Sequence, residues 1–160
     1  MHGSEVTRRQ HGSAPQPEAD KPSLAIMLAA QDEQLALCRE LEDIADSLPG
    51  SVNRQKCIYA AQALGTLMKR THAYEEDVFF PWLERGREAD DRLASILKRL
   101  RYEHFEDECY AEELMEVLLK LGRGDPVNME ATGYMLRGFF EARRRHIAFE
   151  RDHLHTYMRP

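Results

Sequence analysis

Histidine and glutamate occur together, four residues apart, at three places in the chain. The pairs are His72 and Glu76, His104 and Glu108, and His146 and Glu150. On an α-helix, residues four apart lie on one face a turn from each other, so both side chains of a pair project together. Each pair also interrupts a stripe of apolar residues with helical spacing, as Leu64 and Met68 precede His72. The pairs are therefore predicted to face the protein interior.

Carboxylates in such an interior position require a compensating charge. An ionised group without a partner costs many kcal/mol when it is buried. One His/Glu pair alone would more often be a hydrogen-bonded surface pair, but three pairs on three segments favour a bound cation. Imidazole nitrogens with several carboxylates suit iron, manganese or zinc, and carboxylates that can bridge two ions favour a dinuclear centre.

Four long helices are predicted to carry and position these pairs. The first begins at Ser23, its predicted N-cap, and ends at Leu48-Pro49-Gly50. The second runs from Val52 or Asn53 to Phe79-Phe80-Pro81, where proline is expected to end or kink it, and an irregular piece covers Trp82 to Ala89. The third helix ends at Leu121-Gly122, and the fourth runs from about Asn128 to Tyr157. Long helices with short connections pack as antiparallel neighbours. The predicted fold is therefore all-α, an antiparallel up-down-up-down four-helix bundle.

The pairs also lie at matching depths along the predicted helices. His104 precedes the turn at Gly122 by as many residues as His146 follows Asn128 after that turn. His72 lies at a similar distance from the turn that precedes its own helix. Because every helical residue adds the same rise, the three histidines should meet in one layer of the bundle.

Composition and charge exclude several other classes of protein. The net charge of −6 and the pI of about 5.7 argue against a nucleic-acid-binding surface. The basic cluster Arg143, Arg144 and Arg145 is predicted to be a solvated helix face. No apolar stretch approaches the roughly 18 residues that a membrane span requires. Three cysteines without C-x-x-C spacing suit reduced thiols, so the protein is expected to be cytoplasmic.

The first 22 residues differ in composition from the rest of the chain. They contain prolines, glycines and charged residues but almost no large apolar side chain. Such a segment buries too little surface to offset its ordering entropy, which predicts a disordered tail over 1–22 and a helical domain over 23–160.

Deletion of residues 1–20 is expected to leave the melting temperature and metal content unchanged, as thermal unfolding and elemental analysis would show.

Together these segments resemble the hemerythrin family, specifically its bacterial HHE cation-binding branch. The resemblance covers residues 23–157 and rests on H-A-Y-E-E at His72, Y-E-H-F-E-D-E around His104, R-H-I-A-F-E at His146, and F-F-P-W-L from Phe79. It implies a non-haem di-iron centre with three terminal imidazoles and with Glu76 and Glu150 as bridging carboxylates. Glu108 falls where oxygen-carrying members use a second histidine, which points away from the oxygen carriers.

The first predicted helix departs from the family pattern. The family has a metal-binding histidine there, whereas this helix has none and carries Gln31 at the equivalent level. Gln31 offers at most a weak amide oxygen. One metal position would then keep His72 and the bridging carboxylates, and the other would keep His104, Glu108 and His146. The resemblance therefore predicts unequal occupancy, with the position beside His72 the weaker one.

The spacing of the remaining histidines disfavours a ferritin-like bundle. Ferritin-like bundles use Glu-x-x-His on two helices, but that spacing occurs only once here, from Glu150 to His153. His153 is predicted to be a surface or second-shell residue. His155, His2 and His11 are interpreted as incidental.

The family resemblance suggests a protein that senses or handles oxygen, nitric oxide or iron. One alternative is an enzyme that consumes peroxide or nitric oxide, or that donates iron to damaged clusters. Another is a degenerate bundle that acts as a protein-interaction module with partial metal occupancy. The expected partner is a small diatomic ligand or peroxide rather than nucleic acid or a membrane. Whether the protein turns over a substrate is left open by the sequence.

Overall fold

The computed structural model describes residues 22–85 and 90–158 of the chain. Its elements are α1 (Leu24–Ser47), α2 (Arg54–Tyr74), a π-helical turn η1 (Glu75–Phe79), α3 (Phe80–Arg85), α4 (Asp91–Arg123), α5 (Met129–His153) and a 3-10 turn η2 (His155–Met158). No β-strand occurs among the described residues, so the all-α prediction is confirmed. The tail predicted to be disordered lies outside the described residues, apart from Pro22.

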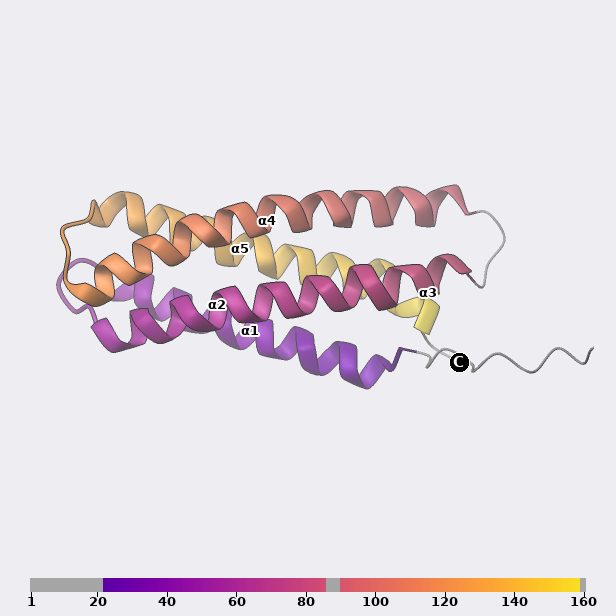
Figure 1. The fold of residues 1–160 in the computed structure, drawn as a ribbon, viewed down its shortest axis with the longest axis horizontal. Coiled ribbons are helices and arrows are strands. Elements are labelled where there is room, and N and C mark those ends of the chain that lie inside the picture. Colours follow the sequence, from indigo (N-terminus) through magenta and orange to yellow (C-terminus); the bar gives the residue numbers. More distant parts are fainter. Residues whose placement is uncertain (1–21, 86–89, 159–160) are drawn as a thin grey trace, which may run out of the picture.

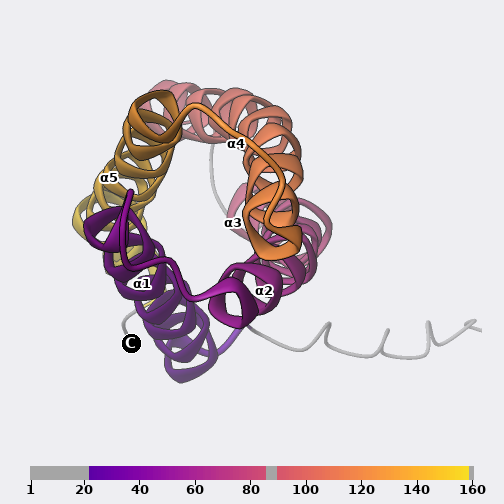
Figure 2. The same cartoon turned by 90° about the vertical axis from the view of Figure 1, so that its left-hand side faces the viewer.

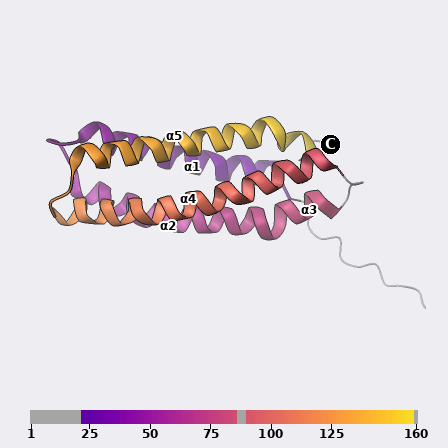
Figure 3. The ribbon, with the colours of Figure 1, turned by 90° about the horizontal axis from the view of Figure 1, so that it is seen from above.

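Four long helical rods run side by side and alternate in direction (Figure 1). The second rod consists of α2, η1 and α3 in succession. Seen along the bundle, the rods form a ring in the order α1, α2, α4, α5 (Figure 2). The view from above shows α2 beside α4 and α1 beside α5, the two pairs with the most extensive packing (Figure 3). This arrangement is the predicted up-down-up-down bundle.

Local signals at the helix ends agree with the predicted boundaries. Each long helix begins at a polar N-cap whose side chain accepts a hydrogen bond from a first-turn N–H; these caps are Ser23, Asn53, Asp90 and Asn128. Such caps satisfy donors that have no partner within the helix. At the end of α4, Gly124 adopts a left-handed φ of 77°, which residues other than glycine rarely adopt.

Of the two outcomes predicted at Pro81, an end or a kink of the helix, the end does not occur. Pro81 lies inside α3, which continues to Arg85, so the predicted irregular piece is helical over 82–85, and 86–89 fall outside the described residues. A proline inside a helix lacks a donor and clashes with a carbonyl in the preceding turn. Here that preceding turn is the wider π turn, in which the Phe80 N–H bonds to the Glu75 carbonyl. The π turn provides the room that lets the helix pass through proline.

Two apolar clusters fill the two ends of the bundle. The cluster nearer the α1–α2 and α4–α5 turns includes Leu41, Leu64, Leu118 and Phe140. The other cluster includes Met27, Phe80, Leu97, Leu100 and Leu154. On every rod at least one buried polar residue lies between the two clusters. The bundle therefore holds one polar layer between two apolar ends, as the matching depths of the histidines predicted.

Two further features bear on the expectations from composition. Cys38, Cys57 and Cys109 are all free thiols, in agreement with the absence of a disulfide pattern. Among the helices of the described residues, none is both long enough and apolar enough to cross a membrane.

Candidate metal centre

Three buried imidazoles from three rods meet in the polar layer. The rings of His72 and His104 stack with centroids 4.0 Å apart, and the rings of His104 and His146 lie 5.4 Å apart. All three side chains are almost completely buried. The structure therefore brings together the three histidines that were predicted from α2, α4 and α5.

Each of these imidazoles is held by a carboxylate on its outer side. The Nδ1 contacts are His72 to Glu108 Oε1 at 2.8 Å, His104 to Glu76 Oε1 at 2.8 Å, and His146 to Glu103 Oε2 at 2.9 Å. Because a carboxylate accepts, each Nδ1 carries the proton, and the neutral ring then has its lone pair at Nε2. This carboxylate–histidine arrangement is the one that orients metal-binding imidazoles.

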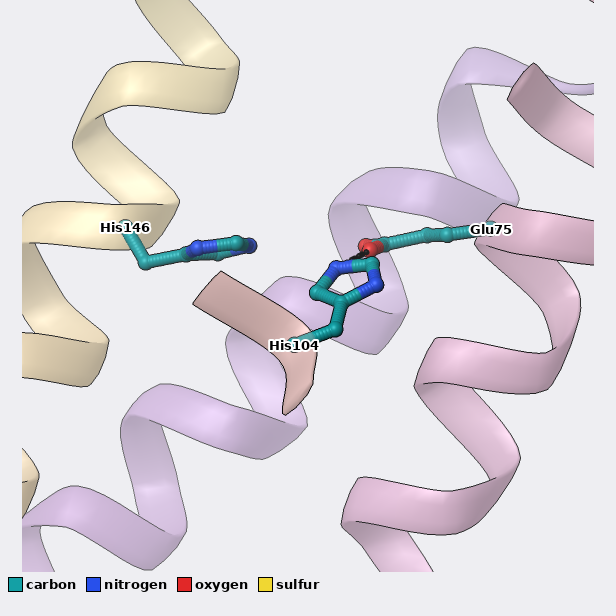
Figure 4. Close-up of side chains that lie close together, drawn as sticks. All are labelled: Glu75, His104 and His146. Atoms are coloured by element: carbon teal, nitrogen blue, oxygen red, sulfur yellow. Dashed lines mark ion pairs between the residues drawn. The ribbon is translucent and has the colours of Figure 1, made fainter. Parts of the chain in front are cut away.

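The inner atoms of the layer are buried and lack hydrogen-bond partners among the described residues. They are the Nε2 atoms of His72, His104 and His146, together with Glu75 Oε2 and Glu150 Oε1. His104 Nε2 lies 2.7 Å from Glu75 Oε2, and His146 Nε2 lies 2.6 Å from Glu150 Oε1, yet neither contact has hydrogen-bond geometry. In Figure 4 the side chains of Glu75, His104 and His146 converge, and each has a ligand atom within 4.8 Å of the others.

Burial controls the charges in this layer. It lowers the pKa of His72 to about 2, helped by the neighbouring His104 and by the positive charge of Arg143, and it lowers the pKa of His104 as well. Burial and the charge of Glu150 raise the pKa of Glu75 well above its ordinary value. The pKa of His146 is raised instead, because its contacts with Glu103 and Glu150 outweigh burial and the charge of Arg143. Neutral His72 and His104, with Nε2 lone pairs turned inward beside buried carboxylates, form a set of ligand atoms that a cation fits.

The inward orientation predicted for Glu76 and Glu108 is wrong. Their side chains are 41% and 47% exposed, and each bonds to the outer nitrogen of a histidine on another rod. Glu75 faces the interior instead. It lies one heptad after the buried Met68, whereas Glu76 lies one heptad after the exposed Lys69. The heptad spacing of a bundle seam, which alternates steps of three and four, would have identified Glu75.

The heptad spacing of the seam also explains which acidic residues of α4 face the interior. Asp107, three residues after His104, lies on the buried seam of α4, and its side chain is only 16% exposed. Glu108 lies one position off that seam. On α5 the seam takes a four-residue step from His146, so Glu150 faces the interior as predicted.

Arg143 lies in the interior, although the Arg143–Arg145 cluster was predicted to be a solvated face. Its side chain is buried, and its guanidinium donates to Asp107 Oδ2 at 2.6 Å and to Gln34 Oε1. Arg145 is exposed, and Arg144 pairs at the surface with Glu42, so the prediction fails for Arg143 alone. Arg143 lies on the buried seam of α5, three residues before His146, and this position outweighs the preference of its charge for solvent.

Gln31 occupies the predicted level on α1 and is fully buried. Its Nε2 lies 3.4 Å from Glu150 Oε2 and 3.2 Å from the Nε2 of His155, while its Oε1 accepts from Arg151 Nε at 2.9 Å. His155 is itself buried beside Gln31, whereas His2 and His11 lie outside the described residues. His153 instead places its ring 4.3 Å from that of Phe149, away from these contacts.

Comparison with known proteins gives one match. A family model described as the Hemerythrin HHE cation binding domain matches residues 23–158. The matched range includes all four rods and every side chain of the polar layer. No curated protein and no solved structure matches the chain.

Proposed function

The chain belongs to the family of hemerythrin HHE cation-binding domains, and on that premise we propose that it binds a non-haem di-iron centre and uses it to sense or handle oxygen, nitric oxide or iron. One observation carries the proposal. Five buried atoms that could bind a metal, three imidazole nitrogens and two carboxylate oxygens, point into one layer. None of them has a hydrogen-bond partner among the described residues. Leaving such atoms unsatisfied costs about 1–3 kcal/mol each, and a bound cation would remove that cost.

The residues suggest how the metal would be held. His104 and His146 would serve one position and His72 the other, with Glu75 and Glu150 shared between them. The outer carboxylates of Glu76, Glu103 and Glu108 would keep each Nε2 turned inward and make the rings more basic. Losing such an outer partner typically weakens metal binding about 10- to 100-fold.

A cavity between α1 and α2 supports a small uncharged ligand. Its volume is about 180 Å³, and its wall includes Met27, Ala30, Tyr74, Gln31 and Glu75. This is smaller than the roughly 300–1,000 Å³ of sites for drug-sized molecules. Bound iron would supply redox chemistry and an open coordination position. The protein would supply a small cavity beside Glu75, with a mostly apolar wall that also includes Gln34, Arg70 and Thr71, which suits oxygen or nitric oxide.

Peroxide chemistry is a second candidate, and the buried Arg143 favours it. Arg143 lies one turn from His146, and its positive charge, after burial, helps lower the pKa values of His72 and His104. The same charge would stabilise an anionic ligand at the metal. An enzyme would consume peroxide or nitric oxide repeatedly, whereas a sensor would bind its ligand once and release it.

The proposal is tested by adding Fe²⁺ anaerobically to the full chain and measuring iron content and the optical spectrum. Iron should bind, and nitric oxide should change the spectrum reversibly. Sustained consumption of peroxide or nitric oxide would select the enzymatic alternative. A matched Glu150→Ala variant should hold much less iron, since it loses a shared carboxylate. A chain that retains no iron after this treatment would refute the proposed function.

A further inference from the structure

Gln31 does not present a ligand atom to the metal layer. Arg151 donates to its Oε1, so the amide oxygen is turned towards the guanidinium. The Nε2 group is consequently turned inward and donates to Glu150 Oε2. An amide N–H₂ has no available lone pair, so α1 contributes a hydrogen-bond donor and no ligand atom at this level.

A fourth buried imidazole approaches this same place from the opposite end of the chain. After α5 ends, the turn η2 folds back and brings His155 Nε2 to 3.2 Å from Gln31 Nε2. The turn is held by packing, because Leu154 is completely buried and Met158 almost so, both within the apolar cluster beside the layer. His155 is therefore held in place by packing on both sides.

The contact with Gln31 also determines which nitrogen of His155 carries the lone pair. The Gln31 amide nitrogen can only donate, so a neutral His155 accepts at Nε2. The Nε2 lone pair thus points towards the amide that bonds to Glu150. The three imidazoles of the layer also present Nε2 inward, and neutral Nε2 is a common metal-binding form of histidine.

We propose that His155 supplies, at the metal position that Glu150 Oε2 faces, the imidazole that α1 lacks. A metal held by Glu150 Oε2 would compete with the Gln31 amide for that oxygen. His155 Nε2, which accepts from the same amide, would then be the nearest imidazole nitrogen to bind it. This inference rests on the proposed function, and it replaces the expectation that the absence of a histidine on α1 weakens one of the two metal positions.

The inference is tested by anaerobic titration of the full chain with Co²⁺, whose visible bands report ligand number and type. The test variant is His155→Gln, which keeps a polar side chain of moderate size and an acceptor for Gln31. His153→Gln is the matched control, because it lies in the same segment and its ring contacts Phe149. The double variant Gln31→His/His155→Gln returns an imidazole from α1.

The wild-type chain and His153→Gln should bind two Co²⁺ ions. In His155→Gln the second ion should bind at least about 10-fold more weakly while the first is unchanged, and the double variant should regain the lost affinity. Recovery through a different helix would separate coordination from a purely structural role. Equal titrations of wild type and His155→Gln, or a double variant no better than His155→Gln, would overturn the inference. Failure of the wild-type chain to bind any Co²⁺ would instead overturn the proposed function together with it.

Discussion

Removal of the metal is expected to lower the melting temperature by on the order of 10 °C. Without metal, the layer buries two carboxylates close together and leaves several nitrogens and oxygens without hydrogen-bond partners. A ligand that binds only the folded chain and is present at 1,000 times its dissociation constant contributes about 4 kcal/mol, and each kcal/mol shifts the melting temperature by a few degrees in a domain of this size. Calorimetry before and after chelation measures the effect.

Two controls accompany this measurement. Adding the metal back should restore the original melting temperature, which excludes damage by the chelator. In Glu150→Gln the chelator should change the melting temperature much less, because that variant holds less metal to begin with. An unchanged melting curve in protein shown by elemental analysis to have lost its metal would contradict the prediction.

Adjacent glutamates on the second rod are expected to behave very differently. Glu75→Gln replaces a buried carboxylate with a neutral amide and should remove most metal binding. Glu76→Gln changes only the outer partner of His104 and should weaken binding about 10- to 100-fold. Titration with Co²⁺ gives both affinities. The band positions should shift in Glu75→Gln and stay unchanged in Glu76→Gln, because only the former loses a ligand atom.

Both variants should fold, which keeps the comparison interpretable. Burial and the charge of Glu150 raise the pKa of Glu75, so the metal-free chain already favours a neutral side chain there. Glutamine has nearly the same shape as a protonated glutamate. If Glu76→Gln loses the metal and Glu75→Gln retains it, the inward carboxylate is Glu76, as the four-residue spacing from His72 predicted.

The overall architecture could be predicted from the sequence because its determinants are local. Apolar periodicity set the helices, and side chains such as Ser23 and Asn128 marked helix starts with their own hydrogen bonds. The shared depth of His72, His104 and His146 followed from counting residues, since each helical residue adds a constant rise. These determinants required no knowledge of which surfaces pack together.

The choice between adjacent side chains depended on the tertiary structure. Neighbouring helical residues point about 100° apart, so a small error in the centre of the buried seam exchanges Glu75 for Glu76. That centre is set by the packing of α2 against α4 and α1. The same packing buries Arg143, whose charge alone suggests a solvated position, because Asp107 and Gln34 on other rods bond to its guanidinium.

His155 required the tertiary structure most of all. No helical period connects it with α1, and its contact with Gln31 joins opposite ends of the described chain. That contact exists because Leu154 and Met158 bury themselves in the apolar end of the bundle and turn the chain back. The helices, and the position of three histidines along the bundle axis, follow from residue spacing alone. The folded chain decided the inward carboxylate, the buried arginine and the fourth histidine, because long-range packing selects which side chains turn inward.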